Sequence, residues 1–402
     1  MTRGKPLLVA AATTLLVAGC SLPFSDHEGQ GAASTTGADG RATAVPSTGD
    51  EGDDKKPVSV TVTGTGDILV HVPVTRSAKS FAQESGSQDE FDFDPMFAGV
   101  KPALSGADVS ICHQETPISA TNDDLSKPGS LVYNVPREIA PALKTAGFDG
   151  CDTASNHVWD RGAKGIDTTR EQLTKAGLKV AGPTTDPADP GMPAVYEAKG
   201  VKVANLSYTY TILNQSGPNT NTPPGADHLG RYLYPKIGAA GIIADAKKAK
   251  EAGADLVVVS VHWGSEYVKE PTKEQQSIAK QLLASPYVDG IFGAHAHLIQ
   301  PCQTFGGKTV FYGLGNFLSN QGPGTVGTLD ENNADGAIAK YTFTRGEDGT
   351  WSQKASYQPT MVDVKGKHKI TLSTPESNPG SFNRTKSAMN ELGSCSATAD
   401  GG

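Results

Sequence analysis

Residues 58–67 read VSVTVTGTGD, and this stretch decides the fold class. Its valines alternate with serine and threonine, which is the period of a β-strand with one buried face. The pattern stops at Gly-Thr-Gly-Asp, so a carboxylate, Asp67, stands at the carboxyl end of the predicted strand. Open α/β folds place their ligand sites at this edge of the sheet, and Asp67 is therefore the first candidate site residue.

Strand and helix patterns alternate after this stretch, and hairpin patterns come late in the chain. We expect helices at 137–146, 165–176, 242–252 and 273–284, and strands at 109–112, 148–153, 178–180, 256–261, 288–292 and 309–312. A hairpin at 195–198 and 201–207 and late strands at 337–343 and 351–358 indicate antiparallel pairing. The sequence therefore predicts one α/β sandwich domain with a mixed sheet rather than a purely parallel one.

The composition narrows the class of protein. The 402 residues contain 37% hydrophobic and 19% charged positions, which suits a globular core and is too polar for a protein with many membrane spans. The formal net charge is −8 and the basic residues are scattered, so nucleic acid is not expected as a partner. A bound cation suits this acidic balance better.

The first twenty residues predict export. Arg3 and Lys5 precede an apolar run, Leu7 to Val17, that is too short to span a membrane as a mature helix. The run ends in Val-Ala-Gly-Cys and resembles the lipobox of bacterial lipoproteins, in which the cysteine, here Cys20, is acylated and becomes the new N-terminus. The alternative is an ordinary signal peptide cut near Ala18. We expect residues 1–20 to be a lipoprotein signal peptide and the protein to be lipid-anchored at the extracytoplasmic face of the cell membrane.

Two segments flank the predicted domain. Residues 21–57 have almost no large apolar side chains and are expected to form a disordered tether between the anchor and the domain. Residues 58–365 form the predicted domain. Residues 366–402 read as a polar C-terminal tail, pinned by a disulfide.

Five cysteines fit an exported protein if Cys20 carries lipid and the other four form two disulfides. The sequence alone allows three pairings of these four. We favour Cys112 with Cys151, because both lie in short apolar segments just before polar motifs and can sit on neighbouring strands. Cys302 then pairs with Cys395, and four buried free thiols are the alternative.

Five polar clusters stand directly after predicted strands. Their side chains are carboxylates, amides and imidazoles, which are oxygen and nitrogen donors for hard or borderline divalent ions. Two imidazoles, His295 and His297, are expected to share one face of an extended segment. The clusters are Gly66-Asp67, His113-Gln114-Glu115-Thr116-Pro117, Ser155-Asn156-His157, His262-Trp263-Gly264-Ser265-Glu266 and Gly293-Ala294-His295-Ala296-His297.

The order and spacing of these clusters resemble the calcineurin-like metallophosphoesterases and, more closely, the CapA-type poly-gamma-glutamate capsule synthesis proteins of the PGA_cap family. The resemblance covers roughly Val58 to Phe317 and includes Asp160 and Gly162 behind the Asn-His pair and a late Leu-Gly-Asn-Phe segment. It implies a metallophosphoesterase-like αββα sandwich with mixed β-sheets.

The resemblance also implies a set of site residues. It gives two divalent metal ions, Mn, Fe or Zn, with Glu115 as the bridge between them. Asp67 and His297 would serve one ion, and the remaining ligands the other. His157 would act as proton donor or transition-state stabiliser, oriented by Asp160. The implied metal ligands are Asp67, Glu115, Asn156, His262, His295 and His297.

This chain departs from the pattern of the resemblance at several positions. Leu69 stands where the wider phosphoesterase pattern has a histidine, and Glu115 replaces an aspartate. His113 stands where CapA-type proteins usually have asparagine, and Ala294 and Ala296 also differ from the usual residues. These departures alter the neighbours of the ligands and one ligand position. His71 is expected to be a loop or surface histidine, with an approach to a phosphate or a metal as the alternative.

Two functions from different classes follow. The first is a metal-dependent hydrolase of the phosphoesterase type, acting on a phosphorylated substrate. The second is a non-catalytic component that binds, exports or tethers an anionic envelope polymer. An acidic body repels a polyanion, so polymer binding needs bound metal or a local basic patch, for which the candidates are Lys127, Arg137, Arg161 and Arg231. Tyrosines that could line a groove are Tyr208, Tyr210, Tyr232 and Tyr234.

Overall fold

The computed structural model describes residues 56–325 and 327–401. The predicted signal peptide with Cys20, and residues 21–55 of the predicted tether, lie outside the described residues. Within the described part of the chain, none of the helices combines the length and the hydropathy that a membrane crossing requires.

A 9-stranded mixed sheet forms one layer of the domain, with the strand order β14-β13-β12-β1-β2-β3-β4, β11 beside β1 and β15 beside β13. Strand β1 is parallel to β2 and β11 and antiparallel to β12. The strands are β1 (Val58–Ile68), β2 (Val109–Gln114), β3 (Gly150–Asp152), β4 (Lys179–Ala181), β11 (Asn316–Leu318), β12 (Asp335–Arg345), β13 (Trp351–Asp363), β14 (Lys369–Leu372) and β15 (Thr398–Ala399).

A 6-stranded mixed sheet forms the second layer, in the order β5-β6-β7-β8-β10-β9. Strands β6, β7 and β8 run parallel, and β5 and β9 join as antiparallel edges. The strands are β5 (Ala194–Ala198), β6 (Val201–Thr209), β7 (Leu256–His262), β8 (Gly290–Ala294), β9 (Ile299–Phe305) and β10 (Lys308–Leu314).

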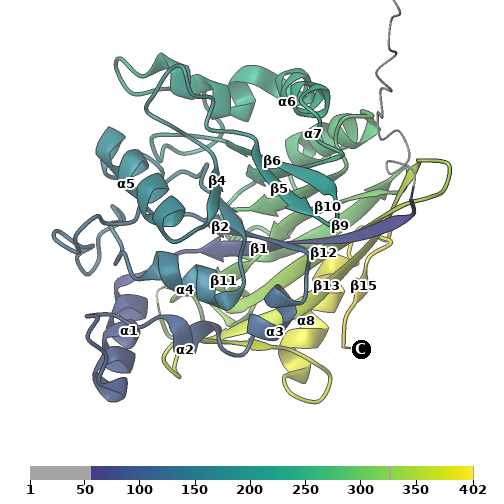
Figure 1. Cartoon of the computed structure of the whole chain (residues 1–402). Coiled ribbons are helices and arrows are strands. Elements are labelled where there is room, and N and C mark those ends of the chain that lie inside the picture. The colour runs from purple at the N-terminus through teal and green to yellow at the C-terminus, as the bar shows by residue number, and fades with distance from the viewer. Residues whose placement is uncertain (1–55, 326, 402) are drawn as a thin grey trace, which may run out of the picture. The chain divides into compact units, whose positions relative to one another are not determined.

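Helices cover the outer faces of both sheets. Figure 1 shows α6 and α7 outside the 6-stranded sheet and α2, α3 and α4 outside the 9-stranded sheet. The predicted αββα sandwich with mixed sheets is confirmed. The helices are α1 (Val72–Ser85), α2 (Asp94–Phe97), α3 (Lys101–Ser105), α4 (Ile139–Ala146), α5 (Gly162–Lys175), α6 (Tyr234–Glu251), α7 (Lys273–Ala284) and α8 (Pro379–Met389), with short 3-10 helices η1 (Asp227–Tyr232) and η2 (Glu331–Asn333).

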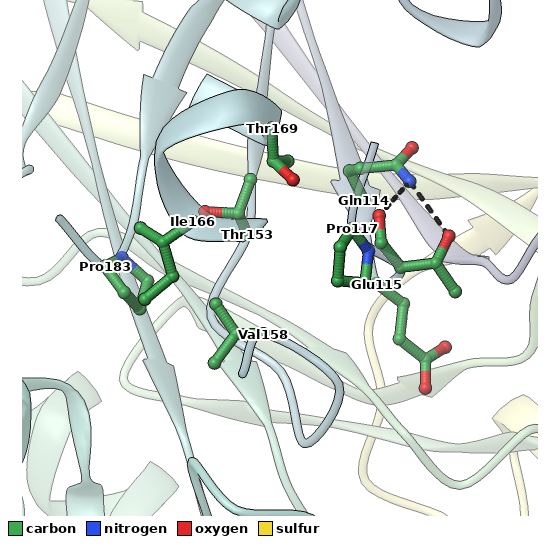
Figure 2. A pocket seen from close by; sticks show the side chains of 9 residues that line it. Gln114, Glu115, Pro117, Thr153, Val158, Ile166, Thr169 and Pro183 are labelled. Carbon is green, nitrogen blue, oxygen red and sulfur yellow. Dashed lines mark hydrogen bonds between the residues drawn. The ribbon is translucent and has the colours of Figure 1, made fainter. Parts of the chain in front are cut away.

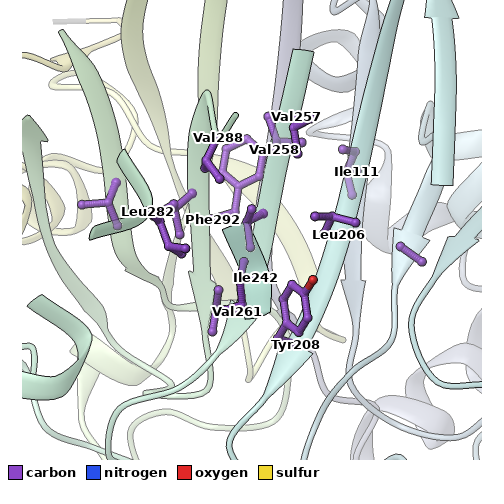
Figure 3. Close-up of a cluster of buried hydrophobic side chains, with 14 of the residues drawn as sticks. Ile111, Leu206, Tyr208, Ile242, Val257, Val258, Val261, Leu282, Val288 and Phe292 are labelled. Carbon is purple, nitrogen blue, oxygen red and sulfur yellow. The ribbon is translucent and has the colours of Figure 1, made fainter. Parts of the chain in front are cut away.

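The core lies between the layers. Figure 3 shows Val257, Val258 and Phe292 from the 6-stranded sheet beside Ile242 and Leu282 from its covering helices. Strand β7 is buried along its whole length, which explains why its residues are apolar on both faces from Leu256 to Val259. A second apolar cluster packs α1 to α4 against the other face of the 9-stranded sheet. Burial of this kind supplies most of the stability of a domain of this size.

Both predicted disulfides are present. Cys112 on β2 is bonded to Cys151 on β3, where the two residues are direct partners in a parallel strand pair. Cys302 on β9 is bonded to Cys395, 93 residues later in the chain. The expectation that Cys112 and Cys151 sit on neighbouring strands is therefore confirmed.

The C-terminal segment extends the sheet. Residues 366–402 were expected to be a polar tail, but β14 and β15 both pair with β13. Helix α8 packs through Phe382 and Met389, and Arg384 forms a two-pronged ion pair with the buried Asp335 at 2.6 and 2.8 Å. The domain therefore continues past the predicted boundary at residue 365. The sequence did not show this, because short strands and one helix with few apolar residues give a weak pattern.

Candidate metal centre

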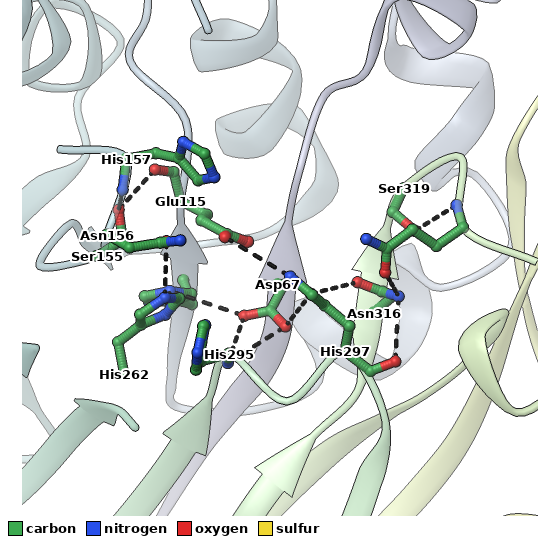
Figure 4. A network of polar contacts seen from close by, with 12 residues as sticks. Asp67, Glu115, Ser155, Asn156, His157, His262, His295, His297, Asn316 and Ser319 are labelled. Carbon is green, nitrogen blue, oxygen red and sulfur yellow. Dashed lines mark hydrogen bonds and ion pairs between the residues drawn. The ribbon is translucent and has the colours of Figure 1, made fainter. Parts of the chain in front are cut away.

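The carboxyl ends of β1 and β2 from one sheet and of β7 and β8 from the other meet at one place. Asp67 and His262 are near or at the ends of β1 and β7, and Glu115 follows β2 directly. The structure brings all six implied ligands together around this point (Figure 4). Each of them is no more than 3% exposed. The six are Asp67, Glu115, Asn156, His262, His295 and His297.

Glycines explain how β1 can present Asp67. A Cβ atom on Gly66 would lie 2.0 Å from the carbonyl oxygen of Gly315, so only glycine allows this close approach of two backbones. The approach lets the Asp67 amide donate a hydrogen bond to that carbonyl, at 2.9 Å. It also pairs Asp67 with Asn316 of β11. The Gly-Thr-Gly-Asp sequence thus fixes the carboxylate at the centre of the site.

The Asp67 carboxylate is surrounded by donors. The backbone N–H of His295 donates to Oδ1 at 3.1 Å, and Nδ1 of His297 donates to Oδ2 at 3.0 Å. Burial opposes ionisation, but the hydrogen bond and the charge of His297 outweigh it, and the pKa of Asp67 is lowered. Asp67 is therefore held as a carboxylate.

Glu115 is a carboxylate of the centre that has no hydrogen-bond partner within the described residues. Both of its oxygens are buried and accept no hydrogen bond within the described part of the chain. Burial raises the pKa of Glu115 to about 7. Figure 2 shows its carboxylate pointing away from Thr153 and Ile166, with which its backbone region lines a small cavity of about 10 Å³.

Asn156 and His262 face each other through polar atoms. Nε2 of His262 lies 3.0 Å from Oδ1 of Asn156. Burial and the neighbouring His295 lower the pKa of His262 well below its usual value, so the ring is held neutral. A neutral imidazole beside an amide oxygen is a suitable pair of donors for a borderline divalent ion.

His113 lies directly behind His262. Its Nδ1 donates to Oδ1 of Asp152 at 2.6 Å, and its Nε2 lies 2.9 Å from Nδ1 of His262. Burial opposes protonation of His113, but the charge of Asp152 raises its pKa to about 9. Asp152, His113 and His262 therefore form a buried chain of hydrogen bonds that fixes the orientation of the His262 ring.

The turn between β8 and β9 places His295 and His297. Both residues have positive φ, 96° and 52°, a conformation that is uncommon for residues other than glycine. The expectation of an extended segment with both rings on one face is therefore wrong. The two rings approach the centre from a strained turn, and their centroids lie 6.0 Å apart.

The two histidines differ in their surroundings. His297 lies with Nε2 3.9 Å from Oε1 of Glu115, and the charges of Glu115 and Asp67 outweigh burial and raise its pKa to about 9. His295 packs against the ring of Tyr210 at 4.4 Å, and its Nδ1 is buried without a hydrogen-bond partner. Burial and the neighbouring His297 lower the pKa of His295 to about 3.

The unpartnered atoms test whether these residues fit a divalent cation. Unpaired buried polar atoms are rare because each costs free energy, and Glu115 and His295 together contribute three of them at one point. The donor set fits a borderline divalent ion. Three groups have ligand atoms within 4.8 Å of one another: Asp67, Glu115 and His297; Asp67, His113 and His262; and Glu266, His295 and His297.

His157 and Asp160 lie beside this centre. Nδ1 of His157 donates to Oδ2 of Asp160 at 2.8 Å, and the backbone N–H of Tyr133 donates to the same oxygen at 2.7 Å. The Tyr133 ring stands edge-on to the His157 ring, with centroids 4.7 Å apart. Asp160 and Tyr133 thus hold His157 in place at the wall of the cleft.

A cleft of about 920 Å³ opens above the centre. Its lining includes His157, His295 and His297, and also His71. His71 lies in the loop before α1, as expected, but it is more enclosed than a surface histidine, since the Asn320 backbone N–H donates to its Nδ1 at 3.2 Å and burial lowers its pKa to about 3. The cleft therefore leads from the surface to the candidate metal centre.

Only part of the predicted groove lies in this cleft. Of the four tyrosines, Tyr210 lines it, while Tyr208, Tyr232 and Tyr234 are buried in the core. Of the four basic candidates, Lys127 lines the cleft, as does Arg76, which was not singled out. Arg137 lies 3.6 Å from Glu138 and Arg161 pairs with Asp124 at 2.9 Å.

His113 and Glu266 are additions to the implied ligand set. Both were noted as members of polar clusters, and His113 also as a departure from a family pattern, but neither was among the implied ligands. A signal for His113 existed, since it is two residues before Glu115 on a strand and so points to the same side. Glu266 reaches the site through a loop, and no local pattern predicts that.

Comparison with known families agrees with the resemblance seen in the sequence. The family described as bacterial capsule synthesis protein PGA_cap matches residues 61–321. The capsule biosynthesis protein CapA of Bacillus anthracis is 30% identical over 265 residues, which are 65% of this chain and 60% of that protein. The PGA biosynthesis protein CapA of Bacillus subtilis is 28% identical over 230 residues, 57% of this chain and 58% of that protein. The chain thus spans about 60% of the length of these relatives.

Solved structures with detectable likeness include two with phosphoesterase or nucleotidase names. The calcineurin-like phosphoesterase YfkN from Bacillus subtilis has a TM-score of 0.44 and 12% identity, covering 84% of this chain and 99% of that chain. A putative 5'-nucleotidase from Staphylococcus aureus has a TM-score of 0.44 and 14% identity, covering 76% of this chain and 55% of that chain.

Proposed function

Because the chain belongs to the PGA_cap family of bacterial capsule synthesis proteins, we propose that its cleft is the active site of a metal-dependent phosphoesterase that serves the making of an envelope polymer. The observation that carries the proposal is the Glu115 carboxylate, which is buried with neither oxygen hydrogen-bonded and with the His297 ring 3.9 Å away. A buried carboxylate without a hydrogen bond is costly, and a bound cation would offset that cost.

We call the six residues of the candidate metal centre the floor of the cleft, and each has a role in the proposed function. Asp67, Glu115, Asn156, His262, His295 and His297 would hold the cations. Divalent cations in such a site supply Lewis-acid stabilisation of the negative charge that develops on a phosphoryl group. The protein's own contribution is orientation, because hydrogen bonds from His295 and His297 to Asp67 and from His113 toward His262 fix the donors before substrate arrives.

His157 is the proposed proton donor. Its Nδ1–H is held by Asp160, which leaves Nε2 for a substrate in the cleft. In the protonated form, Nε2 gives its proton to the leaving oxygen of the ester, and the ring becomes neutral. We expect His157→Ala to lower kcat by about 10²–10⁴ while cation affinity is unchanged.

The proposed location is the outer face of the cell membrane. The apolar run and Cys20 support an exported, lipid-anchored protein, and two disulfides in the described domain suit an oxidising compartment. Metabolic labelling with a fatty-acid analogue tests this, with Cys20→Ala as the control. Loss of the label and release from the membrane in that variant are expected.

The enzymatic proposal is tested by elemental analysis of the purified chain and a substrate screen. We expect bound divalent metal and turnover of a phosphomonoester or phosphodiester, both lost in Glu115→Gln. Turnover of a gamma-glutamyl substrate alone would contradict a phosphoesterase. Metal without turnover, together with retention of an anionic polymer, would favour the non-catalytic role, which the replacement of a ligand position by Leu69 also favours.

A further inference from the structure

Among the described residues, two of the five exposed large apolar side chains line the cleft, and two more are their neighbours in the chain. We call this exposed rim at Leu131 and Tyr267 the mouth of the cleft. Leu131 is 69% exposed and Tyr267 is 45% exposed, and both line the cleft. Their chain neighbours Val132 and Val268 are 48% and 40% exposed. Elsewhere in the described part of the chain, only Leu392 is comparable, at 36%. Exposed apolar groups that cluster over a cleft mark a contact with an apolar ligand or partner.

The walls of the cleft continue this apolar character inward. Leu69, Val72 and Pro73 line it where β1 leads into α1, and Pro128 and Pro218 come from two loops. Leu69 is the residue that stands where the wider phosphoesterase pattern has a histidine. Hydrocarbon therefore forms part of the wall between the mouth and the metal centre, beside polar side chains such as Asn214, Gln215 and Asn320.

Two basic side chains also line the cleft. The side chains of Arg76 and Lys127 line the cleft, and neither forms an ion pair or a side-chain hydrogen bond within residues 56–325 and 327–401. Two unpaired positive charges beside a cation-binding floor attract an anion. A chain with a charge on every unit would have to lie along the apolar walls, where its charges would lose hydration without compensation.

We propose that the cleft takes a phosphate ester of a long-chain alcohol, with the phosphate at the floor and the hydrocarbon chain along the walls and mouth. Arg76 and Lys127 supply positive charge for the entering phosphate. The hydrocarbon covers Leu131 and its neighbours, which are otherwise in water. This inference rests on the proposed phosphoesterase function and names the class of its substrate.

The test compares binding of methylphosphonate and octylphosphonate, two phosphonates that are not hydrolysed, to the purified, metal-loaded chain by calorimetry. Each buried methylene adds to affinity, so we expect octylphosphonate to bind at least about tenfold more tightly than methylphosphonate. The double variant Leu131→Ser, Val132→Ser should reduce this ratio at least about threefold. Leu392→Ser, a matched exposed leucine far along the chain from the cleft, should leave the ratio unchanged.

Equal affinities for the two phosphonates would overturn the inference, and so would the same loss in Leu392→Ser. The proposed function is tested separately with Glu115→Gln. If methylphosphonate binding depends on Glu115 but octylphosphonate binds no better, the inference fails and the function stands. If octylphosphonate binds equally to Glu115→Gln, the proposed function fails.

A last arm separates an ester in solution from one in a bilayer and from simple membrane docking. The chain is mixed with phosphatidylcholine vesicles that contain or lack hexadecyl phosphate, and the vesicles are sedimented. Retention on the phosphate-containing vesicles alone supports an ester taken from a bilayer, while octylphosphonate binding without such retention supports an ester taken from solution. Equal retention on both vesicles, lost in the double variant, would overturn the inference in favour of a membrane-docking surface.

Discussion

The floor and the mouth of the cleft are built in opposite ways. The floor is made by strand ends and the turns that follow them, and its six implied ligands are no more than 3% exposed. The mouth is made by loops, and its apolar side chains reach 69% exposure at Leu131. The floor is polar and buried, whereas the mouth is apolar and exposed, which inverts the usual distribution of residues.

This difference separates the residues that support the fold and bind cations from those that contact ligands only. Buried charges at the floor are held by a network of hydrogen bonds that depends on the fold, so changes there act on both stability and cation binding. Exposed apolar groups at the mouth support little of the fold, so changes there act on ligands alone. Substitutions at successive depths of the cleft test whether this separation holds.

The largest effect is expected at Glu115. Glu115→Gln removes the buried carboxylate that accepts no hydrogen bond within the described residues, and cation affinity should fall by about 3–5 kcal/mol, which is more than a hundredfold. The metal-free variant should be close in stability to the metal-free wild type, because the desolvation cost that is removed opposes the loss of the 3.9 Å ion pair with His297. Calorimetric titration with Zn²⁺ or Mn²⁺ and thermal unfolding with and without chelator measure both quantities.

Glu266 is the matched control at the mouth. It belongs to one of the possible cation-binding groups but is exposed. Glu266→Gln should cost less than about tenfold in cation affinity, as expected for a screened charge. A larger loss at Glu266 than at Glu115 would mean that the cation binds mainly at the group of Glu266, His295 and His297, and that the contrast between buried and exposed carboxylates is wrong.

The second effect concerns His368, a buried residue that contacts Asn320 of the cleft lining. His368 donates from Nε2 to Oδ1 of Asn320 at 2.9 Å and accepts from Ser77 at Nδ1, also at 2.9 Å. Burial lowers its pKa from 6.5 to about 4. The unfolded chain therefore binds a proton that the folded chain does not, and stability rises with pH across this window.

The contribution of His368 should be complete above about pH 6.5 and lost as the pH falls toward 4, with a total on the order of 3 kcal/mol. His368→Asn removes the titrating ring and keeps a residue that tolerates the positive φ of this position, 58°. Urea unfolding of wild type and variant from acid to neutral pH measures the difference in slope. Parallel curves would show that His368 is not held neutral.

The third effect tests the residue behind the floor. His113→Leu breaks the chain from Asp152 to His262, and loss of such a supporting hydrogen bond typically costs about 10–100-fold in metal affinity. His113→Asn restores a side chain that can donate to Asp152 and contact His262, and should recover most of the affinity. The absorption spectrum of the Co²⁺-loaded protein should change in the leucine variant and return toward wild type in the asparagine variant.

Equal cation affinity in wild type and both variants would make His113 a packing residue. A loss of affinity in both variants alike would instead point to direct coordination by the imidazole. Only rescue by asparagine identifies a positioning role, because that side chain reproduces the hydrogen bonds at the back of the site.

The same contrast explains what could be predicted from sequence. The residues of the floor could be predicted from the sequence because they follow strand patterns. The period of two and the rule for strand ends place Asp67 and Glu115 near each other. The Cys112–Cys151 bond was predicted for the same reason. Helix α1 was missed, although its apolar residues such as Val74 and Phe81 pack on the 9-stranded sheet, because its sequence is mostly polar.

The residues of the mouth could not be predicted from the sequence in this way. Leu131 and Tyr267 lie 136 positions apart in loops, and no periodic pattern relates two loops that meet only in the fold. The strained turn of His295 and His297 was likewise misjudged, because a positive φ at histidine is imposed by tertiary contacts such as the hydrogen bond from the His295 amide to Asp67.

The smallest effect is expected at the mouth itself. Leu131→Ser replaces a side chain that is 69% exposed, so it removes little buried apolar surface, and the free energy of unfolding should change by less than about 0.5 kcal/mol. Leu143, fully buried on α4, provides the contrast, since Leu143→Ala should cost about 2–5 kcal/mol. Urea unfolding of the two variants measures both values. If Leu131→Ser lowered the free energy of unfolding nearly as much as Leu143→Ala, the loop of Leu131 would contribute packing to the folded domain. The apolar mouth would then be part of the fold rather than a surface that binds a ligand.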